Sequence, residues 1–232
     1  MLEGCFDRPD CPPVGARWVV PGEALGARTL LAELARLRPG IPFALVDVAR
    51  GNTGIADLLD LARPAGGPLA MVARAAAPAS ALLVFAHGTT DAGRGTPPAA
   101  YVAGTGELIR LLREAGGNPA MPALQAPLSP LRDAYSLLGS GRLAEWTGLA
   151  PGKGWLFDLG VAQLRPLDPA TAAHAAVIRA AQGKAARRYG LLPGGEMVDV
   201  ETGADGIHWS AEGVRQAARE AAAALAATLP PP

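Results

Sequence analysis

The sequence predicts one α/β domain with a parallel sheet, and three observations support this fold class. Short apolar runs rich in β-branched residues alternate with longer helical patterns, as in proteins whose parallel strands are connected by helices. The chain has 232 residues, and 50% of them are hydrophobic, which suffices for one large buried core. Polar segments that contain glycine follow the strand-like runs, at the edge where parallel sheets bind ligands.

Three of the expected strands lie in the first half of the chain, at residues 17–20, 42–49 and 81–86. The second of these is apolar on both faces, as a buried parallel strand is. Between the first two, leucines from Leu25 to Leu37 recur with a helical period, and Pro39 ends that helix. A second helical stretch covers about residues 55–77, with a break at 64–68 where Pro and Gly cluster.

The middle of the chain is expected to hold a helix, a strand and a set of loops. The helix covers about residues 99–115 and ends at a pair of glycines. The strand lies within residues 119–128, although prolines weaken its pattern. Residues 129–168 are rich in Gly and Pro and include Trp146 and Trp155, which suggests loops that wall a pocket.

The last part of the chain is expected to hold two helices and a strand. The first helix covers about residues 169–189, directs Val177 and Ile178 inward, and ends in basic residues that the helix dipole favours. A short strand is expected at residues 196–200. Ser210 is expected to be the N-cap of the final helix, because its hydroxyl can accept from a backbone amide of the first turn.

Composition and charge exclude several classes of partner. The 21 basic and 21 acidic residues give a formal net charge of zero, whereas phosphate binding needs a basic surface. No apolar run approaches the roughly 20 residues of a membrane helix, and the first ten residues do not resemble a signal peptide. We therefore expect no nucleic-acid partner and no membrane. The location stays unknown: the cytoplasm by default, or a phage-like or extracellular assembly.

The domain is expected to cover residues 17–232, preceded by an N-terminal arm at residues 1–16. Cys5 and Cys11 lie in this arm and flank a short segment of Pro and Asp. They are interpreted as two unpaired thiols, with a small disulfide loop as the alternative. Two cysteines make no zinc site by themselves, so neither a metal nor another cofactor is expected.

Four polar segments follow the expected strands and should meet at one edge of the sheet. They are residues 21–25, 50–55, 87–91 and 205–213. Glycine recurs in them because the backbone must come close to whatever is bound there. Four segments on one edge predict a site more specifically than any one of them does alone.

Together the four segments resemble the SGNH (GDSL-type) hydrolases. Asp205-Gly-Ile-His208 is similar to the last block of that family, Asp-x-x-His. RGNTGIADL resembles the second block, whose glycine falls on Gly51, and VFAHGTTDA resembles the third, whose asparagine falls on Thr90. The segments GNTGI, VIRAAQ and DGIHWSAEG are closest to the sialate-O-acetylesterase-related branch, whose glutamine would fall on His87.

The resemblance implies a flavodoxin-like fold, a three-layer α/β/α sandwich with a central parallel sheet. It also implies ester hydrolysis by a serine, with O-acetylated carbohydrate as the substrate class and no cofactor. His208 would take the proton of the nucleophile and Asp205 would orient His208. The remaining residues implied at the oxyanion or substrate site are Gly51, Asn52, His87, Thr90 and Asp91.

The first block departs from the family. Where the family has Gly-Asp-Ser, this chain reads Gly22-Glu-Ala24-Leu25, so Ala24 occupies the place of the nucleophile. In a second register, PGEALGARTLLAEL matches a later Gly-Pro segment of the acetylesterase branch, and the nucleophile would lie upstream of Met1. The first register is preferred because it leaves the sheet complete.

Two functions from different classes follow. The first is a glycan-directed module that binds or attaches to acylated polysaccharide, within a larger assembly, and has little or no esterase activity. The alternative is an active carbohydrate O-acetylesterase that uses His208 and Asp205 with a nucleophile upstream or unrecognised. Each residue also has a structural interpretation: Asp-x-x-His can cap a helix, Gly51 can shape a turn, and Asp91 can cap its loop. A purely structural role within an assembly is the third reading.

Overall fold

The structure is a computed structural model with α/β character, in which long helices surround short strands. It describes residues 2–4, 16–18, 25–43, 46–47, 53–63, 67–76, 83–85, 87–128, 134–137, 162–165, 169–195, 200–201 and 209–228. The described strands pair in three groups, of which two contain parallel neighbours. The α/β fold class predicted from the sequence is therefore confirmed at this level.

One group of parallel strands lies in the middle of the described chain. It has the order β4-β5-β8, with β4 at Leu83–Phe85, β5 at Ala123–Gln125 and β8 at Leu192–Pro193. In the pairing of β4 with β5, Val84 lies opposite Leu124. The parallel strand at 81–86 and the strand within 119–128 were both expected from the sequence.

The second group joins the N-terminus to the chain after the first helix. It consists of β1 (Leu2–Gly4), β2 (Ala16–Trp18) and β3 (Val46–Asp47). β1 runs antiparallel to β2 and parallel to β3. Residues 2–4, assigned to an arm from the sequence, thus pair with the strand expected at 42–49.

The expectation of a first parallel strand at 17–20 is wrong in direction. Arg17 and Trp18 do lie in a strand, β2, but its described neighbour β1 runs antiparallel to it. The described strand parallel to β3 is β1. Alternation of apolar residues shows that a strand exists, whereas its direction depends on a partner that is distant in sequence.

Seven helices are described. They are α1 (Leu25–Leu37), α2 (Ile55–Ala62), α3 (Pro68–Ala76), α4 (Thr89–Arg94), α5 (Pro98–Ala115), α8 (Pro169–Tyr189) and α9 (Ala211–Thr228). The expected break at 64–68 separates α2 from α3, and the helices expected over 99–115 and 169–189 are α5 and α8. A further antiparallel pair, β6 (Ala134–Leu137) with β7 (Ala162–Arg165), is inserted between β5 and α8.

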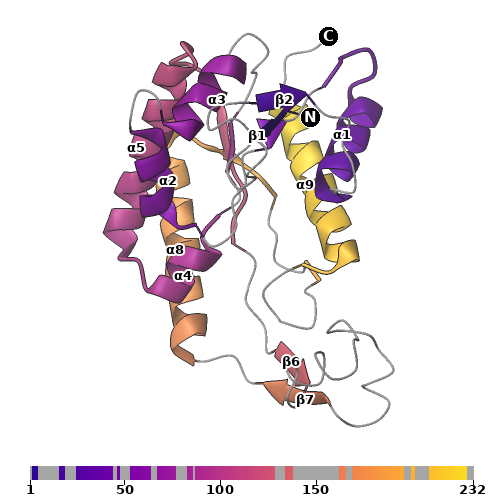
Figure 1. The fold of residues 1–232 in the computed structure, drawn as a ribbon. Helices are drawn as coiled ribbons and strands as arrows, with labels where there is room; N and C mark the ends of the chain where they lie inside the picture. Colours follow the sequence, from indigo (N-terminus) through magenta and orange to yellow (C-terminus); the bar gives the residue numbers. More distant parts are fainter. Residues whose placement is uncertain are drawn as a thin grey trace.

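Two apolar clusters meet at β5. Ala123 packs into the cluster formed with α2, α3, α5 and α8, which we call the α5–α8 core. Leu124, its neighbour in the chain, packs into the cluster of α1 and α9, which we call the α1–α9 core. Figure 1 shows α1 and α9 side by side, apart from the group of α2, α5 and α8. Successive side chains of β5 therefore enter different cores, as the period of a strand requires.

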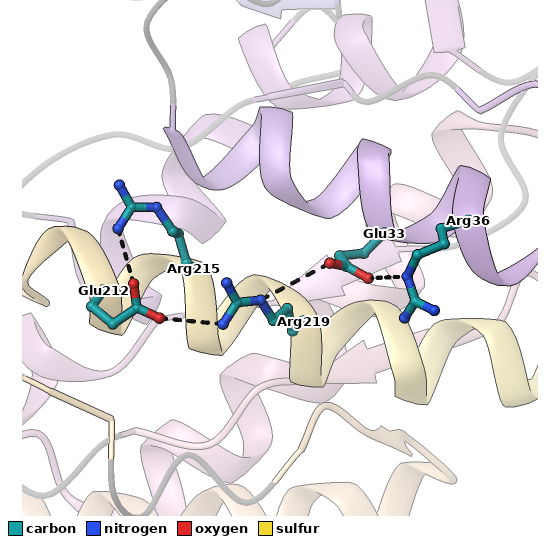
Figure 2. A network of polar contacts seen from close by, with 5 residues as sticks. All are labelled: Glu33, Arg36, Glu212, Arg215 and Arg219. Carbon is teal, nitrogen blue, oxygen red and sulfur yellow. Dashed lines mark hydrogen bonds and ion pairs between the residues drawn. The ribbon is translucent and has the colours of Figure 1, made fainter.

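Charged side chains cover the outside of α1 and α9. Glu33 on α1 contacts Arg36, with 2.8 Å between the carboxylate and Nε, and lies 4.0 Å from Nε of Arg219 on α9. Glu212 contacts Arg215 at 2.9 Å and Arg219 at 3.2 Å. Figure 2 shows this chain of ion pairs running from one helix to the other.

The start of α9 confirms Ser210 as the N-cap. The Ser210 hydroxyl accepts a hydrogen bond of 3.1 Å from the backbone amide of Gly213. The Ser210 amide donates to the Glu201 carbonyl at 3.0 Å. A Cβ at Gly213 would collide with that same carbonyl oxygen, so no larger residue fits at this position. Gly213, the last residue of the segment DGIHWSAEG, is therefore needed for packing.

One prediction in the last part of the chain is wrong, and another is left largely untested. Of the strand expected at 196–200 only Val200 is described, and it is not in a strand; β8 lies earlier, at Leu192–Pro193. Residues 196–199 lie outside the described residues. Val177 is 40% exposed, while Ile178 is 1% exposed, because adjacent residues of a helix point about 100° apart.

Candidate functional site

Five of the residues predicted for the site lie outside the described residues. They are Ala24, Gly51, Asn52, Asp205 and His208. The roles given to them therefore stay predictions. His87, Thr90 and Asp91 are described, and they follow β4 at its carboxyl end. The site is built from these three residues and from the side chains that contact them.

Gly88 brings the chain from β4 into α4 against the side of α8. Its φ of 135° lies in a region that favours glycine. A Cβ on Gly88 would lie 3.0 Å from Nε2 of Gln182 and 3.2 Å from Cγ2 of Ile178. Both the backbone angle and the close contact thus require glycine here, and they set His87 and Thr90 at the end of the strand.

Asp91 connects the segment after β4 with the segment before α2. Its side chain is 1% exposed. Each carboxylate oxygen lies 3.1 Å from the backbone nitrogen of Ile55, which donates, and Oδ1 accepts from the Thr96 hydroxyl at 2.9 Å. A Cβ at Gly54 would lie 3.0 Å from Oδ1, so the glycine permits this approach. The second and third predicted segments therefore meet, as the sequence predicted.

The environment of Asp91 acts on its ionisation in two directions. Burial raises the pKa of this carboxyl, because the charged form loses its hydration. The hydrogen bonds from Ile55 and Thr96 lower the pKa, since they stabilise the carboxylate. The first residue of α2 donates to Asp91, so the carboxylate also lies at the positive end of that helix dipole.

His87 contacts two buried polar side chains from different helices. Tyr101 of α5 is fully buried, and its hydroxyl lies 3.1 Å from Nδ1 of His87. Gln182 of α8 is 1% exposed, and its amide nitrogen donates to the His87 carbonyl oxygen at 2.7 Å and to the Tyr101 hydroxyl at 3.3 Å. The three residues thus form one hydrogen-bonded group, which we call the His87 cluster.

Gln182 also connects the His87 cluster to the end of β5. Its carboxamide oxygen accepts a hydrogen bond of 2.7 Å from the backbone amide of Leu128. Arg179, one turn earlier on α8, donates to the Leu128 carbonyl. The backbone N–H and the backbone C=O of Leu128 are therefore both bound by α8, and the chain after β5 is held beside the chain after β4.

Burial sets the protonation of the cluster. It lowers the pKa of His87 to about 4, because the imidazolium would lose its hydration. It raises the pKa of Tyr101, an effect that the hydrogen bond from Gln182 opposes. At neutral pH the cluster therefore contains a neutral imidazole and a neutral phenol. It can donate and accept hydrogen bonds without holding a charge.

Sequence reasoning missed Tyr101, Thr105 and Gln182. The Thr105 side chain is fully buried and donates to the Tyr101 carbonyl at 2.9 Å. Each of these residues is an isolated polar residue within a helix, and no motif marks it in the sequence. A signal was present in VIRAAQ, where Gln182 lies four residues after the inward-directed Ile178 and therefore on the same face of the helix.

Among the described residues, no cluster of three or more His, Cys, Asp or Glu side chains has the arrangement of a metal site. No helix of the described ranges has the length and apolar character needed to cross a membrane. Comparison with protein-family models, with curated proteins and with solved structures finds no match for this chain.

Proposed function

We propose that the chain is an SGNH hydrolase-like domain that binds an acylated carbohydrate at the carboxyl ends of its parallel strands. We further propose that it cleaves this ligand slowly or not at all. Support comes from one observation above the others. The Asp91 carboxylate accepts a hydrogen bond from the backbone amide of Ile55, so two segments that resemble family blocks are joined at one edge of the strands.

We propose that the strands belong to one central sheet in a three-layer, flavodoxin-like sandwich. The supporting observation is that Ala123 and Leu124 of β5 enter two different cores. The Leu192 side chain of β8 likewise packs with the α1–α9 core. In folds of this kind the ligand binds in the crevice beyond the carboxyl ends of the strands, where His87 and Asp91 follow β4.

Weak or absent catalysis follows from the chemistry of the nucleophile position. If Ala24 occupies it, no hydroxyl is present to attack the ester. Removing the serine of such a triad leaves only the residual rate from binding and from the oxyanion hole. Thr90 in place of the family's asparagine shortens one oxyanion donor. Loss of such a donor raises the barrier by roughly 2.7–4 kcal/mol.

The binding proposal is tested by calorimetry with acetylated and deacetylated forms of the same polysaccharides. Binding of the acetylated form is expected, and Thr90→Val should weaken it. Arg110→Ala is the matched control, because Arg110 is an exposed residue near the end of α5 that pairs with Glu114 and belongs to none of the four predicted segments. If no polysaccharide of either form binds, the proposal is overturned.

A companion experiment tests the register of the nucleophile. Because β2, the strand before Ala24, runs antiparallel to β1, Ala24→Ser is expected to produce acetate release from acetylated sugars only if the chain after β2 returns to the edge at which β3 ends. The double variant with His208→Ala should abolish that gain. Absence of any gain would contradict the placement of the nucleophile at Ala24.

A second candidate function is a thiol-based acyl hydrolase, and the strand pairing favours it. β1 is parallel to β3 and ends at Gly4, and the next residue in the sequence is Cys5. A family nucleophile immediately follows the first parallel strand. His208 would take the proton of the Cys5 thiol as the sulfur attacks the acyl carbon, and it would pass this proton to the sugar alcohol that leaves. Water would then hydrolyse the resulting thioester, which releases acetate and restores the thiol.

The two candidates differ in a simple assay. A thiol hydrolase predicts acetate release by the wild-type protein, loss of this activity in Cys5→Ala, and retention in Cys11→Ala. Activity that survives in Cys5→Ala contradicts the thiol mechanism. Absence of activity together with carbohydrate binding supports the binding module.

A further inference from the structure

The orientation of the Gln182 carboxamide is fixed by its partners. Its oxygen accepts from the amide of Leu128, which can only donate. Its nitrogen lies 2.7 Å from the His87 carbonyl, which can only accept. The second hydrogen on this nitrogen is then directed to the Tyr101 hydroxyl oxygen at 3.3 Å.

The Tyr101 hydroxyl has a single proton to donate. It lies 3.1 Å from Nδ1 of His87 and 3.4 Å from the His87 carbonyl oxygen. That carbonyl already accepts the short hydrogen bond from Gln182. The proton is therefore best used toward Nδ1, which must then be unprotonated in order to accept it.

We propose that Tyr101 and Gln182 are positioning residues that hold His87 as the neutral tautomer with its proton on Nε2. In this arrangement Gln182 fixes the backbone of His87 and the orientation of the Tyr101 hydroxyl. Tyr101 in turn selects the tautomer of the ring. His87 becomes a neutral hydrogen-bond donor at the end of β4.

The tautomer gives the cluster a role in the proposed function, on which this step rests. The family's glutamine, which would fall on His87, also offers a neutral N–H. The Nε2 proton of His87 would serve the carbonyl oxygen of the acyl group. Nε2 is buried, so the ligand oxygen would reach it by displacing protein atoms that now cover it. A donor shielded from water is worth more to a developing oxyanion than an exposed one.

The tautomer is measured directly by long-range proton–nitrogen correlation NMR on the uniformly nitrogen-15-labelled wild-type protein, without ligand. The chain has three histidines, so the signals are assigned with His174→Gln and His208→Gln variants. At pH 7 we expect the His87 ring to show a protonated Nε2 and an unprotonated Nδ1. A protonated Nδ1 at pH 7 would overturn the proposal.

Two variants test the positioning roles. Tyr101→Phe removes only the hydroxyl, and signals of the Nδ1-protonated form of His87 should then appear in the NMR spectrum. Gln182→Leu should do the same, because the Tyr101 hydroxyl is then free to turn. Tyr189→Phe and Gln216→Leu are the matched controls and should leave the wild-type pattern unchanged. An unchanged pattern in folded Tyr101→Phe would also overturn the proposal.

These outcomes are separate from those of the binding assays. If the tautomer is as proposed but no acylated carbohydrate binds, the positioning roles stand and the proposed function fails. If carbohydrate binds but Nδ1 carries the proton, the reverse holds. Addition of acetylated sugar to the labelled protein should shift the Nε2 signal of His87 when both are correct.

Discussion

The two cores that meet at β5 differ in the polarity of the side chains that they bury. The α5–α8 core buries polar side chains among its apolar residues, namely Asp91, Tyr101, Thr105 and Gln182. In the α1–α9 core, the described buried residues are Leu34, Leu124, Ala222 and Leu225, and the charges lie outside. Buried polar groups destabilise a core unless they are hydrogen-bonded, so the first side must satisfy each of them.

The difference favours the α5–α8 side as the location of the proposed site. On the α5–α8 side, the hydrogen bonds of Asp91 and Gln182 hold the chain that follows β4 and β5. On the α1–α9 side, apolar contacts hold two helices together, and exposed ion pairs lie on the surfaces of these helices. These four buried polar side chains are not needed for stability alone, because apolar residues of similar size stabilise a core at least as well.

The largest expected effect of a single substitution is that of Asp91→Ala. It removes the acceptor of the Ile55 amide and the Thr96 hydroxyl and leaves a buried donor without its partner. We expect the free energy of unfolding, from urea denaturation, to fall by about 3–4 kcal/mol. Asp60→Ala on the exposed face of α2 is the control and should change it by less than about 0.5 kcal/mol. A small loss for Asp91→Ala would contradict the connecting role of this carboxylate.

A pH titration of stability tests the burial of His87. The folded protein keeps His87 neutral down to about pH 4, whereas the unfolded chain protonates it near 6.5. The unfolded state therefore binds the proton first as the pH falls, and the free energy of unfolding decreases between pH 6.5 and about 4. Over this window the loss should reach about 3 kcal/mol.

The same titration on His87→Gln isolates this contribution. Asp91 acts in the opposite sense, because its raised pKa favours the folded state as the pH falls through that value. The difference between wild type and His87→Gln removes the part due to Asp91. If the two proteins show the same pH dependence, the surroundings of His87 do not lower its pKa.

Part of the fold and of the candidate site could be predicted from the sequence, and the missing parts have physical reasons. The helices α5 and α8 follow from their period and from the residues that end them. Strand direction did not follow, because β1 and β2 are set by partners far away in the chain. The meeting of Asp91 with the start of α2 was predicted at the level of segments. The His87 cluster was not, since Tyr101 and Gln182 are single residues in two separate helices.

A smaller effect is expected from glycines on the two sides. Gly213→Ala would place a Cβ against the Glu201 carbonyl, which is backbone and cannot move aside cheaply. We expect the free energy of unfolding, from thermal denaturation, to fall by about 2 kcal/mol. Gly183→Ala on α8 is the matched control, because its Cβ would meet only Arg187 at 3.6 Å. That variant should be stabilised by up to about 1 kcal/mol. Equal effects of the two would contradict the packing at the start of α9.

The smallest effect should come from the ion pairs between α1 and α9. Arg219→Ala removes contacts to Glu33 and Glu212 that lie at the surface. We expect the free energy of unfolding to fall by less than about 1 kcal/mol. The loss should vanish in about 1 M salt, where the screening length is only about 3 Å. A loss that persists at high salt would show that Arg219 contributes through packing.

We propose that the carboxyl ends of β4 and β5, with the start of α2, form a binding site for acylated carbohydrate. Backbone NMR of the labelled protein during titration with an acetylated oligosaccharide locates the binding site. We expect the perturbed signals to gather at residues 53–55 and 87–91, and we expect the deacetylated sugar to perturb them less. Unperturbed spectra, or changes confined to α1 and α9, would contradict it.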